Sequence, residues 1–216
     1  MSRALPQRDP VIVLASASPR RRELLTAIGV PFLVDPADVD ETPGVQETPY
    51  ALVRRLAEAK ATAVLARRGA DLPVLGADTL VVVDGRVLGK PRDRADALGM
   101  LQRLSGRSHE VLTALALANA GDVQVVLSRT RVWFRELEAG EAERYWATGE
   151  PRDKAGAYGI QGIGGIFVDR LEGSYSAVVG LPVAETDRLL RRFGIDGWAE
   201  RIPMPATGDE PRADDP

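Results

Sequence analysis

The segment SASPRR, residues 16–21, combines features that favour anion binding. It follows a short apolar run at 11–15 and precedes residues with helical periodicity, so we expect it to join a strand to the start of a helix. The backbone N–H groups and the dipole of a helix N-terminus attract anions, and the forked donors of Arg20 and Arg21 match phosphate oxygens. The alternative is a solvated first turn, although the dipole disfavours cations at that end.

Asp78 marks a second segment with potential chemistry, because it lies at the mouth of the apolar run GADTLVVV. Burial of a carboxylate is costly unless charge or hydrogen bonds compensate it, so we expect a metal ion, a lysine or an arginine nearby. The alternative is a turn-forming aspartate. Asp40 and Glu41 are candidates to complete a hard-cation site, although a solvated acidic turn explains them better from the sequence alone.

The donor set narrows the choice of metal. The chain has no cysteine and a single histidine, His109, so the available ligands are oxygens, which suit Mg²⁺ or Mn²⁺ rather than zinc. The missing cysteines also exclude disulfides and cysteine nucleophiles. His109 precedes an apolar strand without a nucleophile motif such as G-x-S-x-G, so we expect a structural role for it.

Two glycine-rich segments imitate nucleotide-binding motifs without matching them. The segment GRVLGKP is one residue short between its glycines for a P-loop, and Pro91 stands where Ser or Thr would hold magnesium. Lys90 in this segment is either an anion ligand at a strand end or an ordinary surface lysine. The run at 156–165 lacks the G-x-G-x-x-G spacing, so a dinucleotide-binding fold has no support.

The composition limits the possible partners. The 216 residues are 44% hydrophobic, enough for one sizeable core divided into two lobes around a cleft. A net charge of −3 favours no nucleic acid, and no window is apolar enough for a signal peptide or a membrane span, so we expect a cytoplasmic protein. We expect one domain at 11–203, between an N-terminal extension at 1–10 and a disordered acidic tail at 204–216.

Strand and helix signals alternate irregularly along the chain. Capping residues predict helices from Ser18-Pro19 to Gly29, from Thr48-Pro49 to Gly69 and from Asp93 to Gly106, with further helices near 139–148 and 182–193. The second helix is expected to bury Leu52, Val53, Leu56, Ala59, Ala63 and Val64. Asp84-Gly85 predicts a hairpin, and 109–134 predicts another. The glycine-rich segment is expected to be a loop, followed by a strand and a turn.

These elements predict an α/β protein of the α+β mixed type, with a mixed twisted sheet and flanking helices. Five segments then occur in an order that resembles the Maf family of nucleoside triphosphate pyrophosphatases over residues 11–193: LASASPRRRELL, GADTLVVVDGRVLGKPRD, LSGRSHEVLTALAL, DKAGAYGIQG and GSYSAVVGLPV. The resemblance implies a Maf/ITPase-like fold with a deep cleft between two lobes, frequent homodimers, and cleavage of a nucleoside triphosphate to the monophosphate and pyrophosphate with a divalent cation.

The resemblance also implies roles for individual residues. Asp78 matches the catalytic proton acceptor, and Glu41 matches an acidic position near the metal, so Asp78 and Glu41 are the predicted metal ligands. Positions associated with the phosphates are matched by Ser16, Arg20, Arg21, Lys60 and Lys90, of which Lys60 and Lys90 are predicted to take part in catalysis. An alternative for Lys60 is an ordinary ion pair with a neighbouring glutamate, worth about 0 to 1 kcal/mol if exposed.

Three residues resemble the subgroup that acts on dTTP and UTP: Arg20, Thr79 and Gln161. The neutral Gln161 amide offers both a donor and an acceptor, as a uracil or thymine edge requires. Two alternatives stay open, namely a nucleotide-binding regulator of cell division, with which the family is also associated, and a pyrophosphatase for inosine or xanthosine triphosphates.

Overall fold

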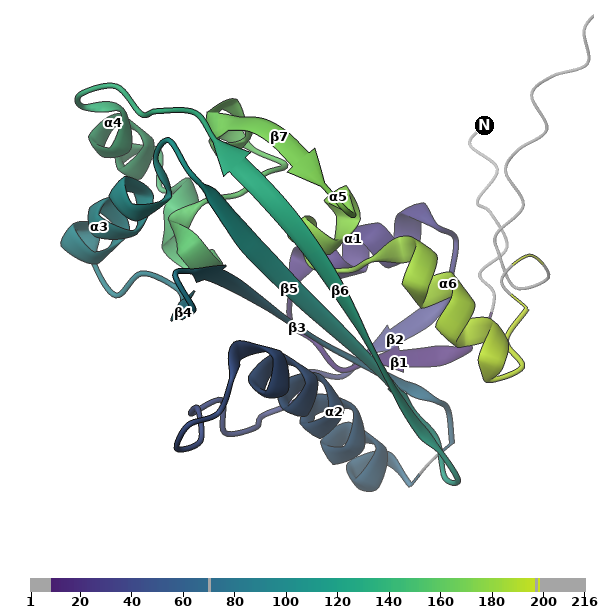
Figure 1. Ribbon diagram of the computed structural model, residues 1–216. Coiled ribbons are helices and arrows are strands. Elements are labelled where there is room, and N and C mark those ends of the chain that lie inside the picture. Colours follow the sequence, from purple (N-terminus) through teal and green to yellow (C-terminus); the bar gives the residue numbers. More distant parts are fainter. Residues whose placement is uncertain (1–8, 70, 197, 199–216) are drawn as a thin grey trace, which may run out of the picture.

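A mixed sheet organises the computed structural model, which describes residues 9–69, 71–196 and 198 (Figure 1). The strand order is β2-β1-β3-β5-β6-β7, with β4 paired to β3. β1 (Ile12–Leu14) is parallel to β2 (Phe32–Val34) and to the start of β3 (Val74–Val83). β4 (Arg86–Leu88), β5 (Ser108–Ala118), β6 (Val123–Phe134) and β7 (Val168–Glu172) continue it by antiparallel pairing. The predicted fold class is therefore confirmed.

Helices flank both faces of this sheet. α2 (Pro49–Arg68) covers one face, whereas α1 (Pro19–Ala27), α5 (Tyr175–Val179) and α6 (Val183–Arg192) lie on the other. α3 (Arg94–Leu104) and α4 (Glu141–Ala147) cluster at the far end of the long strands (Figure 1). Three short 3₁₀ turns, Glu150–Asp153, Ala155–Ala157 and Ile163–Phe167, join α4 to β7.

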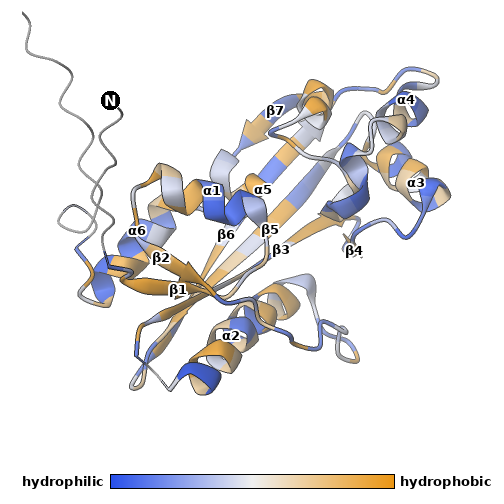
Figure 2. Cartoon of the chain, turned by 180° about the vertical axis from the view of Figure 1, so that it is seen from behind, coloured by the Kyte–Doolittle hydropathy of each residue, from blue (hydrophilic) through white to orange (hydrophobic). Residues whose placement is uncertain are grey.

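The hydrophobic interior is divided between the two ends of the molecule. At one end, α3 and α4 enclose aromatic residues such as Phe134, Tyr145 and Phe167. At the other end, separate clusters fill the space under α2 and under α1 and α6. Figure 2 shows the hydrophobic strands at the centre and hydrophilic residues on the outer sides of the helices. The strands β3 and β5 contribute residues to the hydrophobic clusters at both ends and so connect them.

Local signals in the sequence placed most element boundaries correctly. The side chain of Thr48 accepts a hydrogen bond from the backbone N–H of Ala51 at the start of α2, and Asp93 accepts one from the N–H of Asp96 at the start of α3. Asp84 and Gly85 both have positive φ, at 50° and 72°, as a two-residue hairpin turn requires. The two capping hydrogen bonds satisfy backbone donors that helix ends leave unpaired.

Two expectations about local structure were wrong. In α2, Ala63 is exposed and Ala59 half-buried, because Ala57, Lys60 and Ala61 face the sheet instead. The turn expected after β7 is the short helix α5, capped by Ser174. The glycine-rich loop includes two 3₁₀ turns.

The structure describes little of the two predicted terminal segments. Most of the predicted extension at 1–10 and the whole predicted tail at 204–216 lie outside the described residues. Within the described ranges, every helix is too short or too polar to cross a membrane.

Candidate active site

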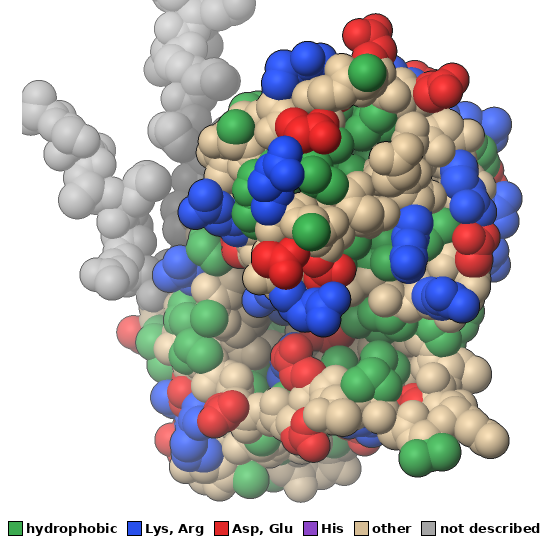
Figure 3. Space-filling model, turned by 90° about the vertical axis from the view of Figure 1, so that its left-hand side faces the viewer, with side chains coloured by type: hydrophobic (Ala, Val, Ile, Leu, Met, Phe, Trp, Pro, Cys, Tyr) green, Lys and Arg blue, Asp and Glu red, His purple; other side chains and the backbone are tan. Residues whose placement is uncertain are grey.

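A cleft of about 520 Å³ opens at the edge of β3. On this edge, β1 pairs with Val74 and Leu75 and β4 pairs with residues 81–83, so 76–80 have no partner strand there within the described part of the chain. Figure 3 shows the hollow, with acidic and basic side chains on its rims. Because side chains alternate between the two faces of a strand, this open edge gives one ligand access to both faces of the sheet.

An ionic cluster occupies the α2 face of this edge. Lys60 Nζ lies 2.7 Å from Asp78 Oδ1 and 2.6 Å from Glu41 Oε1. The Lys60 and Asp78 side chains are only 11% and 10% exposed, whereas Glu41 is 61% exposed. The cation that the buried Asp78 carboxylate requires is therefore a lysine of the same chain.

Gly76 allows α2 to approach β3 closely enough for this contact. A Cβ added to Gly76 would lie 2.2 Å from the carbonyl oxygen of Ala57 and 2.7 Å from the nitrogen of Ala61. Gly76 and Asp78 share a face of β3, as residues two apart in a strand do. The missing side chain of Gly76 therefore sets the distance between β3 and the turn of α2 that carries Lys60.

Burial dominates the acidity of Asp78. Loss of solvent raises the pKa of this carboxyl above its ordinary value. The charge and the hydrogen bond of Lys60 oppose this rise, and so does the charge of Arg21. A carboxylate with a raised pKa is a stronger base than one in water. Asp78 thus combines basicity with a position inside the cleft, which is what activation of a water molecule requires.

Arg21 acts as a strut on the opposite face. Its guanidinium donates from Nε to the Gly180 carbonyl at 2.9 Å, from Nη1 to Ser16 Oγ at 3.1 Å and from Nη2 to Thr79 Oγ1 at 3.2 Å. Burial lowers the pKa of Arg21, with the charge of Asp78 opposing the shift. Ser16 lies behind Arg21, accepts from the backbone N–H of Ser18 and is nearly buried.

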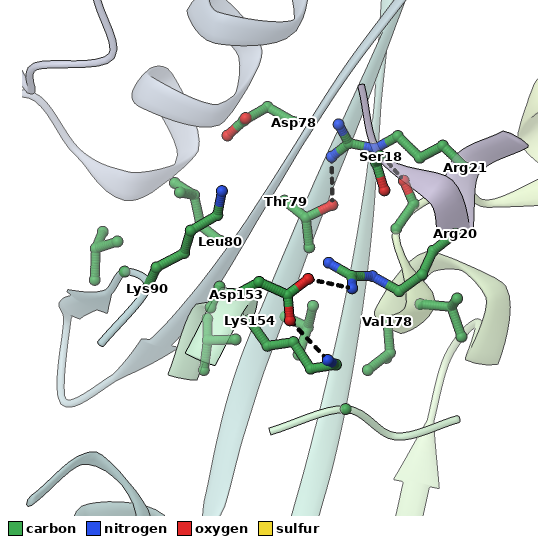
Figure 4. A pocket seen from close by; sticks show the side chains of 18 of the residues that line it. Ser18, Arg20, Arg21, Asp78, Thr79, Leu80, Lys90, Asp153, Lys154 and Val178 are labelled. Atoms are coloured by element: carbon green, nitrogen blue, oxygen red, sulfur yellow. Dashed lines mark hydrogen bonds and ion pairs between the residues drawn. The ribbon is translucent and has the colours of Figure 1, made fainter. Parts of the chain in front are cut away.

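Arg20 is held toward the cleft by a carboxylate from a distant segment. Its Nη1 lies 3.2 Å from Asp153 Oδ2, while Lys154 Nζ lies 2.8 Å from Asp153 Oδ1 (Figure 4). Asp153 and Lys154 line the cleft but were not among the predicted site residues. They belong to the quoted motif DKAGAYGIQG, and that motif was the only signal in the sequence that pointed to them.

The remaining predicted residues also line the cleft. Lys90 extends into it from the end of the β3-β4 hairpin, on the side opposite Arg20 and Arg21 (Figure 4). Thr79 and the exposed Gln161 lie along the same cleft. The structure therefore brings together residues from six separate segments. Of the candidates, Ser16 lies behind the cleft wall, and Asp40 lies outside the lining, where its Oδ1 accepts a hydrogen bond from the Thr42 N–H.

A carboxylate shapes the loop that carries Gln161. Glu150 accepts hydrogen bonds from the backbone N–H groups of Ile163 and Gly164 and from the Tyr145 hydroxyl. A Cβ on Gly162 would lie 2.4 Å from Glu150 Oε2. Close approach of backbone requires Gly164 and Gly165, because an added Cβ would lie 2.9 Å from the Gly159 nitrogen and 2.6 Å from the Ile160 carbonyl oxygen respectively.

His109 has the surroundings of a structural residue. It is 2% exposed, its Nε2 lies 2.8 Å from the Tyr158 hydroxyl, and its ring packs edge-on against Tyr158 and Phe134. Burial lowers the pKa of His109 to about 4, so the ring is neutral at physiological pH. The hydrogen bond orients the Tyr158 ring in the cleft wall.

The residues present are compatible with a magnesium or manganese ion. Among the described residues, no group of three or more His, Asp or Glu side chains could hold a metal by itself. Asp78 and Glu41 nevertheless reach toward one point, marked by Lys60 Nζ. Mg²⁺ in nucleotide-processing sites is typically bound by one or two carboxylates together with substrate phosphates, and this pair of carboxylates fits that pattern.

The fold and the cleft define a class of site in which cationic side chains surround a buried carboxylate. The model of the family described as Maf-like protein matches residues 11–193, and the chain belongs to this family. It is 54% identical over 191 residues to the dTTP/UTP pyrophosphatase of Hahella chejuensis, covering 88% of this chain and 95% of that protein. It is 56% identical over 182 residues to the dTTP/UTP pyrophosphatase of Pectobacterium atrosepticum, covering 84% and 92%.

Among solved structures, the chain is similar to a nucleoside-triphosphatase, also called dITP/XTP pyrophosphatase, from Mycobacterium abscessus. The TM-score is 0.40 at 22% identity, covering 60% of this chain and 77% of that one.

Proposed function

We propose that this protein hydrolyses dTTP and UTP to the nucleoside monophosphate and pyrophosphate. The observation that carries the proposal is the buried Asp78–Lys60 pair inside a cleft that Arg20 and Lys90 also line. The cleft volume of about 520 Å³ lies within the usual range for small-molecule sites. The relatives named dTTP/UTP pyrophosphatase, at more than half identity, support the same activity.

In the proposed mechanism, Asp78 accepts a proton from a water molecule. The water oxygen forms a bond to the α-phosphorus, and the bond from that phosphorus to the oxygen bridging to the β-phosphorus breaks. Pyrophosphate leaves with the bridging oxygen. Lys60 and Lys90 are placed to stabilise the negative charge that develops on the phosphates, which is usually a large contribution in phosphoryl transfer.

Arg20 is placed to bind the phosphates at the N-terminus of α1, where the helix dipole also favours anions. Its ion pair with the exposed Asp153 is weak enough to exchange for a phosphate, because exposed pairs contribute about 0 to 1 kcal/mol. Arg21 has already committed donors to three protein oxygens, so we assign it mainly to holding Thr79 and Gly180 in position.

Glu41 and Asp78 would hold the divalent cation, either Mg²⁺ or Mn²⁺, together with the substrate. When bound, this ion would neutralise phosphate charge and favour attack on phosphorus. Lys60 Nζ lies between these two carboxylates, within ion-pair distance of both. Homodimer formation and a cytoplasmic location stay predictions.

The test compares rates of pyrophosphate release from UTP, dTTP, ITP and 7-methyl-GTP with Mg²⁺ present. We expect the highest kcat/KM for UTP and dTTP, because Gln161 and Thr79 offer neutral hydrogen-bonding groups for a pyrimidine edge. Preference for ITP or 7-methyl-GTP would contradict the assigned substrate class. Nucleotide binding without pyrophosphate release would contradict the enzymatic role and favour a regulator.

A further inference from the structure

Thr79 is the most exposed residue of β3. It lies on the face of β3 opposite Asp78 and lines the cleft. Its direct cross-strand partner in β5 is Thr113, which is 0% exposed and does not line the cleft. A ligand in the cleft therefore meets Thr79, while Thr113 lies behind it.

The hydroxyl hydrogens of these two threonines have a defined direction. Thr113 Oγ1 lies 2.7 Å from the carbonyl oxygen of Ala177 and 3.1 Å from Thr79 Oγ1. A carbonyl oxygen can only accept, and a hydroxyl has a single hydrogen to donate. Thr113 therefore gives its hydrogen to Ala177 in the shorter contact, and the contact between the threonines is donated by Thr79.

Arg21 completes the surroundings of the Thr79 oxygen. Its Nη2 donates to Thr79 Oγ1 at 3.2 Å and occupies one of the two acceptor positions of this hydroxyl. With its hydrogen directed to Thr113 and one lone pair taken by Arg21, Thr79 presents a single lone pair to the cleft. It can accept a hydrogen bond from a ligand but cannot donate one.

This polarity determines what Thr79 can recognise. Phosphate oxygens offer no hydrogen at neutral pH apart from a partly protonated terminal group, so Thr79 is unsuited to the triphosphate. Opposite N3, an acceptor pairs with the hydrogen of uracil or thymine but meets an unprotonated acceptor in cytosine. Opposite position 4, it would instead accept from the amino group of cytosine, so the preference for uracil requires that Thr79 face N3. Two acceptors that face each other without a hydrogen leave both groups unsatisfied, which disfavours binding.

We propose that Thr113 is a positioning residue for base selection: it fixes Thr79 as an acceptor opposite N3 of the base, and so favours uracil and thymine nucleotides over cytosine nucleotides. The inference rests on the proposed function, since it concerns the base of the same triphosphate. It assigns selectivity to a residue that the substrate does not touch.

The test measures kcat/KM for UTP and for CTP in the wild type and in Thr113→Val. Valine has nearly the shape of threonine but accepts no hydrogen bond, so the Thr79 hydrogen becomes free to turn toward the cleft. We expect the UTP-to-CTP ratio of kcat/KM to fall by about tenfold, the usual scale for one mismatched hydrogen bond. Most of the fall is expected from faster CTP hydrolysis through a lower KM.

Two further variants exclude a general effect of losing a buried hydroxyl. Thr113→Ser keeps the hydroxyl and is expected to keep the wild-type ratio. Thr186→Val removes another fully buried threonine hydroxyl, which donates to the Pro182 carbonyl at 2.8 Å in α6, away from the cleft. It is expected to change stability but not the ratio.

Affinity measurements for UTP and CTP by calorimetry, with Ca²⁺ in place of Mg²⁺, separate this inference from the proposed function. If the wild type prefers UTP in binding and Thr113→Val loses that preference without any hydrolysis, the inference stands and the enzymatic role fails. If the wild type hydrolyses UTP but Thr113→Val keeps the wild-type ratio, the enzymatic role stands and the inference is overturned. An equal change in Thr186→Val also overturns it.

Discussion

Asp78 and Thr79 are neighbours in β3, yet they belong to two different chemical environments. Asp78 faces α2 and contacts an ammonium group, in a cluster governed by charge. Thr79 faces the other side and belongs to a neutral chain of hydroxyls that ends at a carbonyl oxygen. Because the strand edge between them is open, one nucleotide can contact both. The period of two in a strand therefore gives adjacent residues a charged environment on one face and a hydroxyl network on the other.

The largest expected effect comes from removing the charge of Asp78. Asp78→Asn keeps the size of the side chain but removes the base, so we expect kcat to fall by about 10²- to 10⁴-fold, the usual range for general-base assistance. Binding of UTP should change little. Pyrophosphate release measures kcat, and calorimetry measures binding.

A matched control is Asp153→Asn, which removes another carboxylate that lines the same cleft. Asp153 is 62% exposed and contacts Arg20 and Lys154 rather than the expected position of the water. We expect a loss below about tenfold, in keeping with an exposed ion pair. Equal losses in the two variants would show that the position of Asp78 carries no special role.

A second, smaller effect is expected from Lys60→Met, which leaves the Asp78 carboxylate without its nearest cation. We expect kcat/KM to fall by about 10²-fold, as for removal of one electrostatic donor. The pH profile should also move. Lys60 lowers the pKa of Asp78 against the effect of burial. In Lys60→Met the pKa of Asp78 therefore rises further, and the loss of activity on acidification begins at a higher pH than in the wild type.

The sign follows from the form of Asp78 that reacts. The base is active when ionised, so the rate is complete above the raised pKa and is lost as the pH falls through it. Lys90→Met is the matched control, since Lys90 lines the cleft but is not among the charged groups that shift the pKa of Asp78. Lys90→Met should lower kcat/KM, because a cation near the phosphates is lost, but leave the acid side of the profile in place. An unmoved profile in Lys60→Met would contradict the pairing.

The smallest effect concerns the support of the ionic side. Gly76→Ala forces α2 away from β3, because the added methyl group would overlap the backbone of Ala57 and Ala61. We expect a loss of about 1 to 3 kcal/mol in the free energy of unfolding, and a lower kcat because Lys60 moves from Asp78. The UTP-to-CTP ratio should persist, because the Thr79 side does not depend on α2.

Gly99→Ala provides the control for this substitution. Gly99 is exposed in α3 and an added Cβ would meet nothing within 4 Å. Alanine in a helix interior is about 0.5 to 1 kcal/mol more favourable than glycine, so this variant should be slightly more stable. Thermal or denaturant unfolding distinguishes the two glycines, and a similar loss in both would contradict the close-approach argument.

Local chemistry in the sequence was sufficient to predict caps, hairpins and most helix bounds. Thr48, Asp93 and the pair Asp84-Gly85 each act through backbone groups within a few residues, so their effects are independent of the distant fold. The short helix α5 was missed because five residues carry too little periodicity, although its cap Ser174 was a usable signal. The burial stripe of α2 was wrong only at Ala59 and Ala63, because a hydrophobic pattern does not include a buried lysine such as Lys60.

The candidate site was predictable only as a set of residues. The sequence indicated that Asp78 needs a cation, but the identity of that cation depends on a contact between α2 and β3 that Gly76 permits. Arg21 was predicted to bind phosphate, yet its partners Gly180 and Thr79 are brought to it from remote segments. The chain of hydroxyls through Thr113 arises from strand register, which single-residue patterns do not reveal.

The most direct test of the central claim is hydrolysis of UTP in ¹⁸O-labelled water, with mass spectrometry of both products. A water molecule activated by Asp78 for attack on the α-phosphorus places the label in UMP and leaves pyrophosphate unlabelled. Label in the pyrophosphate would place the attack on the β-phosphorus and contradict the account.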